Sequence, residues 1–283
     1  MKLKAYGSRG SMAFSHRQGL KTGGNTSCFG LDVNGHTVVF DCGSGIMQFH
    51  EDMQKKRKED AAAGRADHGL TFDILLSHLH LDHIIGLSLF DFLFDADNTI
   101  RVYTRSRANT PLVDQVLGIF KPPYWPVDYR SLNRAAFVEI IGGETIQLAD
   151  GVEVKIFDSM HDNATSGFRV FGEGKSVVYL LDYEIGSDEE QFESLAAFCK
   201  DADAVVFDAT YLPEDYPPRR GWGHSTYEDG MRLAEASACR KMIFSHFFHA
   251  YSDETVASIA ERAKGGSGRT VYIAAYDGME LEI

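Results

Sequence analysis

The chain has 283 residues, a formal net charge of −13 at pH 7, 44% hydrophobic residues and 24% charged residues. This composition is ordinary for a globular protein, and no apolar run approaches the ~20 residues of a membrane span. The N-terminus lacks the apolar segment of a secretory signal, so we expect a cytoplasmic protein that makes no use of a membrane. Four scattered cysteines (Cys28, Cys42, Cys199 and Cys239) argue against both a disulfide framework and a Cys-rich zinc site.

The first half of the chain alternates between strand and helix patterns. Strands are predicted over residues 2–8, 28–34, 36–45, 71–77 and 100–104, and helices over residues 46–63, 84–94 and 110–120. The Asn34-Gly35 pair indicates a tight hairpin turn between two of the strands. Residues 121–130 contain three prolines and are predicted to form a loop.

The second half shows the same kind of alternation. Strands are predicted over residues 136–141, 144–149, 152–160, 167–172, 176–182, 204–210, 241–247 and 270–276, and helices over residues 188–199, 225–238 and 253–264. Two groups of strands with interspersed helices favour an α/β fold with two packed sheets and helices outside. No linker-like segment separates the halves, so residues 1–283 are interpreted as one domain.

Polar residues follow five of the predicted strands. The strands over 71–77, 152–160, 176–182, 204–210 and 241–247 end at or near His78, His161, Asp182, Asp208 and His246. In layered α/β folds, sites assemble from loops at one edge of the sheet. Each residue alone is compatible with a structural role, and their shared position at strand ends is what predicts a site.

The segment from His78 to His83 is the densest of these positions. Its pattern H-x-H-x-D-H places His78, His80, Asp82 and His83 directly after an apolar strand. Histidine and aspartate without cysteine favour zinc, with manganese or iron as alternatives. Two divalent ions need about three to four ligands each, so His161, Asp182 and His246 are the natural additions.

The pattern resembles that of the metallo-β-lactamase superfamily over nearly the whole chain. The resemblance implies a four-layer αβ/βα sandwich of two mixed sheets flanked by helices. It implies one ion held by His78, His80 and His161, another held by Asp82, His83 and His246, and Asp182 between the two. Asp41 in the stretch FDCGSG matches an early aspartate that supports the site from behind the ligands, with an ordinary turn aspartate as the alternative interpretation.

Two further stretches, FDATY and GHST, resemble the paired motifs of tRNase Z and related phosphodiesterases. The resemblance implies that Asp208 orients His224, which donates a proton to the leaving oxygen or binds phosphate. The tRNase Z family usually has a glutamate at this position, so Asp208 is a departure that shortens the reach. His224 could instead simply begin the following helix, with Ser225 or Thr226 as its cap.

The N-terminal stretches GSRGS and GGNTSC resemble the same branch, which includes phosphoribosyl cyclic phosphodiesterases. Candidate substrate-binding residues are Asn25, Thr26, Ser225, Arg219 and Arg220. Plain tight turns, and a solvated arginine pair, are the alternative interpretations. The aromatic residues of the 121–130 loop are candidates for stacking on a base or for a dimer contact. His249 is a candidate for a supporting role behind the site.

The most favoured function is therefore a dinuclear metal-dependent phosphodiesterase that acts on a small, preferably cyclic, nucleotide or ribose phosphodiester. In the expected reaction a metal-bridged hydroxide attacks phosphorus, with Asp82, Asp208 and His224 as the catalytic residues. A net charge of −13, with no long Gly- and basic-rich arm, makes nucleic acid the less favoured partner. A tRNase Z-like endonuclease and a thioester or lactone hydrolase are the alternatives, and a homodimer is expected.

Overall fold

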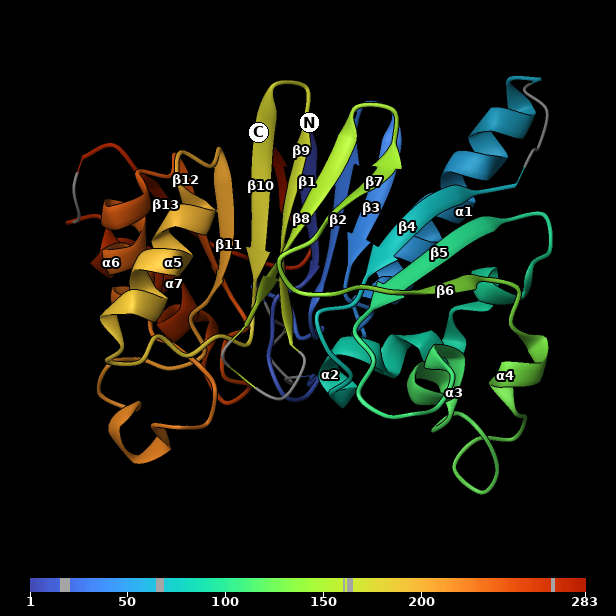
Figure 1. Ribbon diagram of the computed structural model, residues 1–283, viewed down its shortest axis with the longest axis horizontal. Helices are drawn as coiled ribbons and strands as arrows, with labels where there is room; N and C mark the ends of the chain where they lie inside the picture. Colours follow the sequence, from blue (N-terminus) through green and yellow to red (C-terminus); the bar gives the residue numbers. More distant parts are fainter. Residues whose placement is uncertain (16–20, 65–68, 160, 162–164, 266–267) are drawn as a thin grey trace.

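The computed structural model describes residues 1–283 apart from 16–20, 65–68, 160, 162–164 and 266–267. Two seven-stranded sheets lie face to face, and helices cover the outer face of each (Figure 1). The predicted α/β fold of two mixed sheets flanked by helices is thereby confirmed.

The first sheet combines an antiparallel part with a parallel part. Its strands are, in spatial order, β14 (Glu280–Glu282), β1 (Lys2–Gly7), β2 (Cys28–Val33), β3 (His36–Phe40), β4 (Thr71–Leu75), β5 (Thr99–Thr104) and β6 (Ala136–Glu139). Pairing is antiparallel from β14 to β3 and parallel from β3 to β6. Asp41 and His78 therefore follow neighbouring parallel strands and lie at the same edge of the sheet.

The second sheet has the same design. Its strands are, in spatial order, β13 (Val271–Ala274), β12 (Lys241–Ser245), β11 (Ala204–Asp208), β10 (Lys175–Leu180), β9 (Ser166–Gly172), β8 (Val152–Asp158) and β7 (Thr145–Ala149). Pairing is parallel from β10 to β13 and antiparallel from β7 to β10. Asp182, Asp208 and His246 thus lie at the carboxyl ends of three neighbouring parallel strands.

The helices divide between the two outer faces (Figure 1). On the first sheet lie α1 (Ile46–Ala62), α2 (Leu81–Ile84), the 3-10 turns η1 (Ile85–Leu89) and η2 (Asp91–Phe94), α3 (Leu112–Leu117) and α4 (Tyr129–Leu132). On the second lie α5 (Glu189–Cys199), α6 (Tyr227–Ser237) and α7 (Asp253–Ala263), and the short turn η3 (Pro217–Arg219) belongs to the loop between β11 and α6. No helix within the described residues has the length and apolarity needed to cross a membrane.

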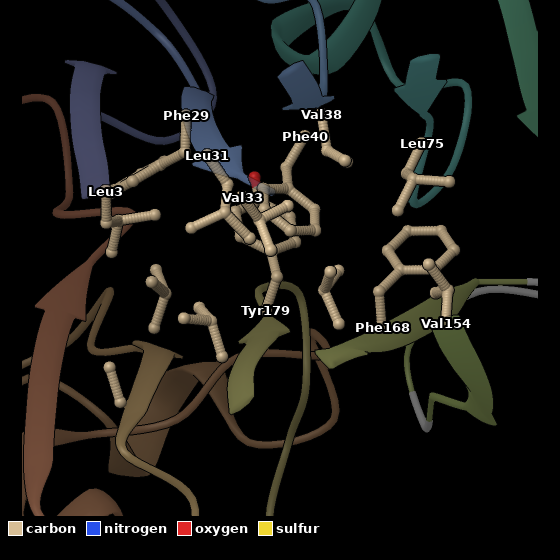
Figure 2. Close-up of a cluster of buried hydrophobic side chains, with 14 of the residues drawn as sticks. Leu3, Phe29, Leu31, Val33, Val38, Phe40, Leu75, Val154, Phe168 and Tyr179 are labelled. Atoms are coloured by element: carbon tan, nitrogen blue, oxygen red, sulfur yellow. The ribbon is translucent and has the colours of Figure 1, made fainter. Parts of the chain in front are cut away.

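The core between the sheets is built from alternate residues of the strands. Leu3, Phe29 and Phe40 of the first sheet face Phe168 and Tyr179 of the second (Figure 2). The rings of Phe40 and Tyr179 stack with centroids 4.8 Å apart. Two further clusters fill the space between each sheet and its helices. Burial of this apolar surface holds the two sheets in a fixed relation and so fixes the edge where their strands end.

The prediction of one helix over residues 84–94 is wrong. Helix α2 already begins at Leu81 and is followed by two 3-10 turns. The chain is diverted because the Gly86 N–H donates to the carbonyl of Cys42 (3.0 Å), and a Cβ on Gly86 would lie 2.2 Å from the carbonyl oxygen of Gly43. The structure also shows β14 and α4, which the sequence patterns did not indicate, and residue 160 of a predicted strand lies outside the described residues.

Candidate metal centre

The seven residues predicted as metal ligands come together where the carboxyl ends of both sheets meet. Their ligand atoms form two groups with all atoms of a group within 4.8 Å of one another: His78, His80, His161 and Asp182, and beside them Asp82, His83 and His246. A third overlapping group joins Asp182, Asp208, His224 and His246. The residues come from segments as far apart as β4 and β12.

The nitrogen and oxygen atoms of these side chains converge closely. Nε2 of His83 lies 2.9 Å from Oδ2 of Asp182 and 3.2 Å from Nε2 of His246. Nε2 of His161 lies 3.3 Å from Nδ1 of His80. Imidazole nitrogens that face one another at such distances need a proton or a cation between them, because two lone pairs repel.

Two buried atoms show that the residues fit a cation. Nε2 of His78 is buried and has no hydrogen-bond partner within the part of the chain that the structure describes. Oδ2 of Asp182 is also buried, and its contact with Nε2 of His83 (2.9 Å) does not have the geometry of a hydrogen bond. Buried polar atoms are almost always satisfied, so such atoms call for a partner. Histidine nitrogens and carboxylate oxygens without thiolates match the ligand chemistry of zinc and related ions. The clusters are consistent with a dinuclear metal site.

At His78, His161 and Asp182 the surroundings favour the protonation states that bind a metal ion. At His83 burial would lower the pKa, but Asp182, Asp82 and Asp41 outweigh it and raise that pKa well above its ordinary value. Burial lowers the pKa of His78 well below its ordinary value, and burial also lowers the pKa of His161. Burial alone would raise the pKa of Asp182, but His246, His83 and His78 outweigh it and hold that pKa well below the ordinary value. Neutral imidazoles and an ionised carboxylate are the forms that bind a metal ion.

Asp41 lies directly behind the cluster and accepts four hydrogen-bonding contacts. The N–H and hydroxyl of Ser77 donate to its carboxylate (2.7 and 2.8 Å), and Nδ1 of His83 lies 2.7 Å from Oδ2. The hydroxyl of Tyr179, from the opposite sheet, donates to the same oxygen (2.8 Å). A carboxylate on Nδ1 fixes the ring so that Nε2 faces the site.

The backbone at the site is strained in three places. Asp41, Asp182 and His246 have φ values of 56°, 53° and 62°, although each carries a side chain. Thr210 stabilises the strained backbone at His246, because its hydroxyl donates to the His246 carbonyl (2.8 Å) and lies 2.9 Å from Nδ1 of the ring. Left-handed backbone outside glycine tends to occur at functional sites, where surrounding contacts maintain it.

Asp208 and His224 form the predicted pair. Oδ2 of Asp208 lies 2.9 Å from Nδ1 of His224, so the shorter carboxylate does reach the ring. The ring of His224 lies 5.1 Å from those of both His161 and His246, measured between centroids. Burial would lower the pKa of His224, but Asp208 raises it to about 9, so the imidazole is protonated at neutral pH.

The two arginines predicted to bind substrate occupy different surroundings. The guanidinium of Arg219 lies over the rings of both Tyr211 and Phe248, with its carbon 5.2 and 5.3 Å from their centroids. Tyr211 in turn packs edge-on against His224. Arg220 is exposed and lies over Tyr216. Arg219 is therefore the better placed of the two to reach a substrate at His224.

The other predicted substrate-binding residues have internal partners. Thr26 is buried and its hydroxyl accepts from the Ser44 N–H (2.8 Å). The Ser225 hydroxyl donates to the Tyr183 carbonyl (2.7 Å) and accepts from the Ile185 N–H (3.0 Å). The side-chain oxygen of Asn25 accepts from Ser44, and Asn25 also lines a cavity of about 700 Å³. A substrate contact by these three residues stays a prediction.

The 121–130 loop turns most of its aromatic surface inward. Tyr129 is buried, and Trp125 packs against it with ring centroids 5.7 Å apart. Tyr124 is 82% exposed and Trp125 is half-buried, so Tyr124 offers a partner molecule the most open ring surface of the three. The ring of His249 packs at a tilt against Phe248, with centroids 4.4 Å apart, and Phe248 in turn contacts Arg219.

Four residues of the site were missed by reasoning from the sequence. Ser77, Thr210 and Glu184 each lie within two positions of a predicted site residue, and this closeness in sequence is the signal that could have identified them. Tyr179 lies inside an apolar strand and shows no such signal. The hydroxyls of Ser77 and Thr210 lie at hydrogen-bond distance from the rings of His78 and His246. Tyr179 instead donates to Asp41, and Glu184 accepts from Tyr216, Gly221 and Gly223.

The sequence is similar to a known family model and to curated ribonuclease Z proteins. A family model described as "Beta-lactamase superfamily domain" matches residues 36–247. A ribonuclease Z from Bradyrhizobium sp. (strain ORS 278) is 26% identical, covering 81% of this chain and 86% of the relative. A ribonuclease Z from Haloferax volcanii is 22% identical, with 91% and 89% covered.

Solved structures show the same fold at low identity. The human short-form tRNase Z has a TM-score of 0.64 at 17% identity, covering 100% of this chain and 99% of its own. A diphosphatase from the PhnP family has a TM-score of 0.65 at 18% identity, covering 100% and 97%. Zinc-bound PqqB from Methylobacterium extorquens has a TM-score of 0.67 at 17% identity, covering 100% of each chain.

Proposed function

Because the chain belongs to the metallo-β-lactamase superfamily, we propose that it hydrolyses a small phosphodiester, preferably a cyclic nucleotide or cyclic ribose phosphate. The observation that carries this proposal is the Asp208–His224 pair beside the candidate metal cluster. Thioester hydrolysis leaves this pair without a role, since a thiolate departs without a general acid. A lactone also releases an alkoxide, so the pair does not separate it from a diester.

The metal ions would be held by His78, His80 and His161 on one side and by Asp82, His83 and His246 on the other, with Asp182 between them. Zinc is the favoured ion, with manganese or iron as alternatives. When bound, two such ions acidify a water molecule near neutral pH and neutralise charge on the phosphoryl oxygens.

The residues of the chain complete the chemistry. Asp208 engages Nδ1 of His224, which leaves Nε2 of that ring for the substrate. As an oxygen from water bonds to phosphorus and the ester bond breaks, the His224 proton passes to the departing alkoxide, and a phosphomonoester results. Arg219, which lies over the rings of Tyr211 and Phe248, supplies positive charge toward the remaining phosphoryl oxygens.

Cleavage of RNA is the second candidate, because relatives over most of the chain are named ribonuclease Z. A net charge of −13 opposes it, since affinity for polynucleotides is built from many cationic contacts. A small diester needs few such contacts. The two candidates therefore differ in substrate size rather than in the chemistry at phosphorus.

The test is hydrolysis of 2′,3′- and 3′,5′-cyclic nucleotides, linear diesters and a precursor tRNA by zinc- and manganese-loaded protein, beside His224→Ala. We expect turnover of a small diester and a loss of about 100-fold or more in kcat in the variant, with metal content unchanged. Turnover of tRNA alone would favour the nuclease. No diester turnover by metal-loaded wild type would overturn the proposal.

A further inference from the structure

We propose that Glu184 is a positioning residue, which anchors the loop at residues 216–223 and thereby holds His161 and His224 in the geometry that the site requires. Glu184 follows β10 two positions after Asp182 and is half-buried. The inference deepens the proposed function and rests on it only for its kinetic readout. Its other readouts concern the loop and the metal.

Three donors from the loop converge on the Glu184 carboxylate. Oε1 accepts from the Tyr216 hydroxyl (2.6 Å) and from the Gly221 N–H (2.7 Å). Oε2 accepts from the Gly223 N–H (2.7 Å). A single side chain therefore connects both ends of a loop that has no regular structure beyond the short η3 turn.

The anchored loop contacts His161 through Gly223. The Gly223 carbonyl lies 3.0 Å from Nδ1 of His161, which is the distance at which that nitrogen donates its hydrogen. The bond leaves Nε2 of His161 directed toward His80 and Asp182, at 3.3 and 3.7 Å. Fixing the tautomer of a ligating histidine is the usual role of such a partner, and here the partner is itself held by Glu184.

The same region fixes His224. Ser225 joins the segment after His224 to Tyr183 and Ile185, the two neighbours of Glu184 in the chain. Glu184 and Ser225 thus fasten residues 221–225 to residues 183–185 on both sides of His224. Loss of the Glu184 contacts would release the main chain before His224, while Asp208 would still hold its ring and Ser225 the main chain after it.

An ionised carboxylate suits this position better than an amide. All three neighbours are donors, and a glutamine would offer one accepting oxygen and turn its NH2 group against another donor. Hydrogen bonds to an ionised acceptor are also the stronger ones. Glu184→Gln therefore weakens the anchor with almost no change in side-chain volume.

The experiment compares Glu184→Gln with Glu214→Gln, both zinc-loaded. Glu214 precedes the same loop but is exposed and pairs with Arg262 (3.1 Å), so it controls for loss of a nearby charge. Three quantities are measured: hydrogen–deuterium exchange of peptides covering 216–224, zinc affinity by competition with a chelator, and kcat and KM for the best diester.

We expect E184Q to exchange its loop amides faster and to bind zinc about tenfold or more weakly. We expect kcat to fall while KM changes less, and E214Q to resemble wild type in all three measurements. Unchanged zinc affinity in folded E184Q would overturn the proposal, whether or not the loop exchanges faster. If E184Q fails to fold, Tyr216→Phe, which removes one donor, decides by the same zinc criterion. Absence of diester turnover in the wild type would instead count against the proposed function, and the zinc and exchange results would still decide the role of Glu184.

Discussion

Asp208 contacts Nδ1 of His224 at 2.9 Å while the same carboxylate accepts from three main-chain N–H groups, of Thr210, Asp182 and Ser225. One buried side chain thus fixes both the ring of His224 and the backbone at the ends of β10 and β11. The acid and the residues around it cannot shift independently.

Substitution of Asp208 tests this relationship. In Asp208→Asn the amide can present its NH2 group to Nδ1, which favours the wrong tautomer and removes the charge that keeps His224 protonated. We expect kcat for a diester to fall by about 100-fold or more while zinc content changes little. Asp203→Asn, in the same strand region but bonded to Ser176, is the matched control and should leave kcat unchanged.

Removal of the Tyr179 hydroxyl tests the support of Asp41 from the opposite sheet. Tyr179→Phe leaves the Asp41 carboxylate with one donor fewer, so His83 is held less firmly. We expect zinc affinity to fall by about tenfold and the free energy of unfolding by about 1–2 kcal/mol. Tyr272→Phe is the control, because the buried Tyr272 hydroxyl has no partner within the described residues. An equal zinc affinity in both variants would contradict the role given to Tyr179.

Substitutions at two glycines of the same loop distinguish the effect of backbone strain from the effect of a clash with His161. Gly221 and Gly223 both have φ of 86°, but a Cβ on Gly223 would lie 1.8 Å from Nδ1 of His161, whereas one on Gly221 meets open space. Both alanine variants should lose about 1–2 kcal/mol of stability from strain. Only Gly223→Ala should also weaken zinc binding, measured by chelator competition. Equal zinc affinities would show that His161 does not depend on this contact.

Asp277 predicts a dependence of stability on pH. Burial raises the pKa of its carboxyl to about 6, although the Asn25 N–H and Ser8 donate to it. The folded protein therefore binds this proton more tightly than the unfolded chain, so stability falls as the pH rises from about 4 to about 6 and stays lower above that.

Asp277→Asn should remove this loss. We expect the variant to gain up to about 2–3 kcal/mol over wild type at pH 7, and the gain to vanish toward pH 4, in denaturant unfolding at several pH values. Asp253→Asn should have the opposite sign at pH 7, because hydrogen bonds from Thr22 and Lys21 lower the pKa of Asp253 despite burial. A gain for D277N that is the same at every pH would contradict the explanation.

The fold and the positions of the metal-binding candidates could be predicted because their signals are local. His78 to His83 form one dense cluster, and Asp182, Asp208 and His246 each end an apolar strand. The contacts of Tyr179 could not be predicted, since they depend on how two sheets face each other. The end of the helix expected over residues 84–94 depends on a contact between Gly86 and Cys42, which likewise joins distant segments.

The bond from Tyr179 to Asp41 joins positions 138 apart in the chain, and His83 meets His246 at a separation of 163. The H-x-H-x-D-H segment leaves the ribosome early, but it lacks these contacts until β10 and β12 have been synthesised and the sheets have closed. Contacts of such long range form late and slowly in folding. Tight metal uptake should therefore mark the completion of folding rather than its nucleation, and an N-terminal fragment ending before β10 should bind zinc weakly.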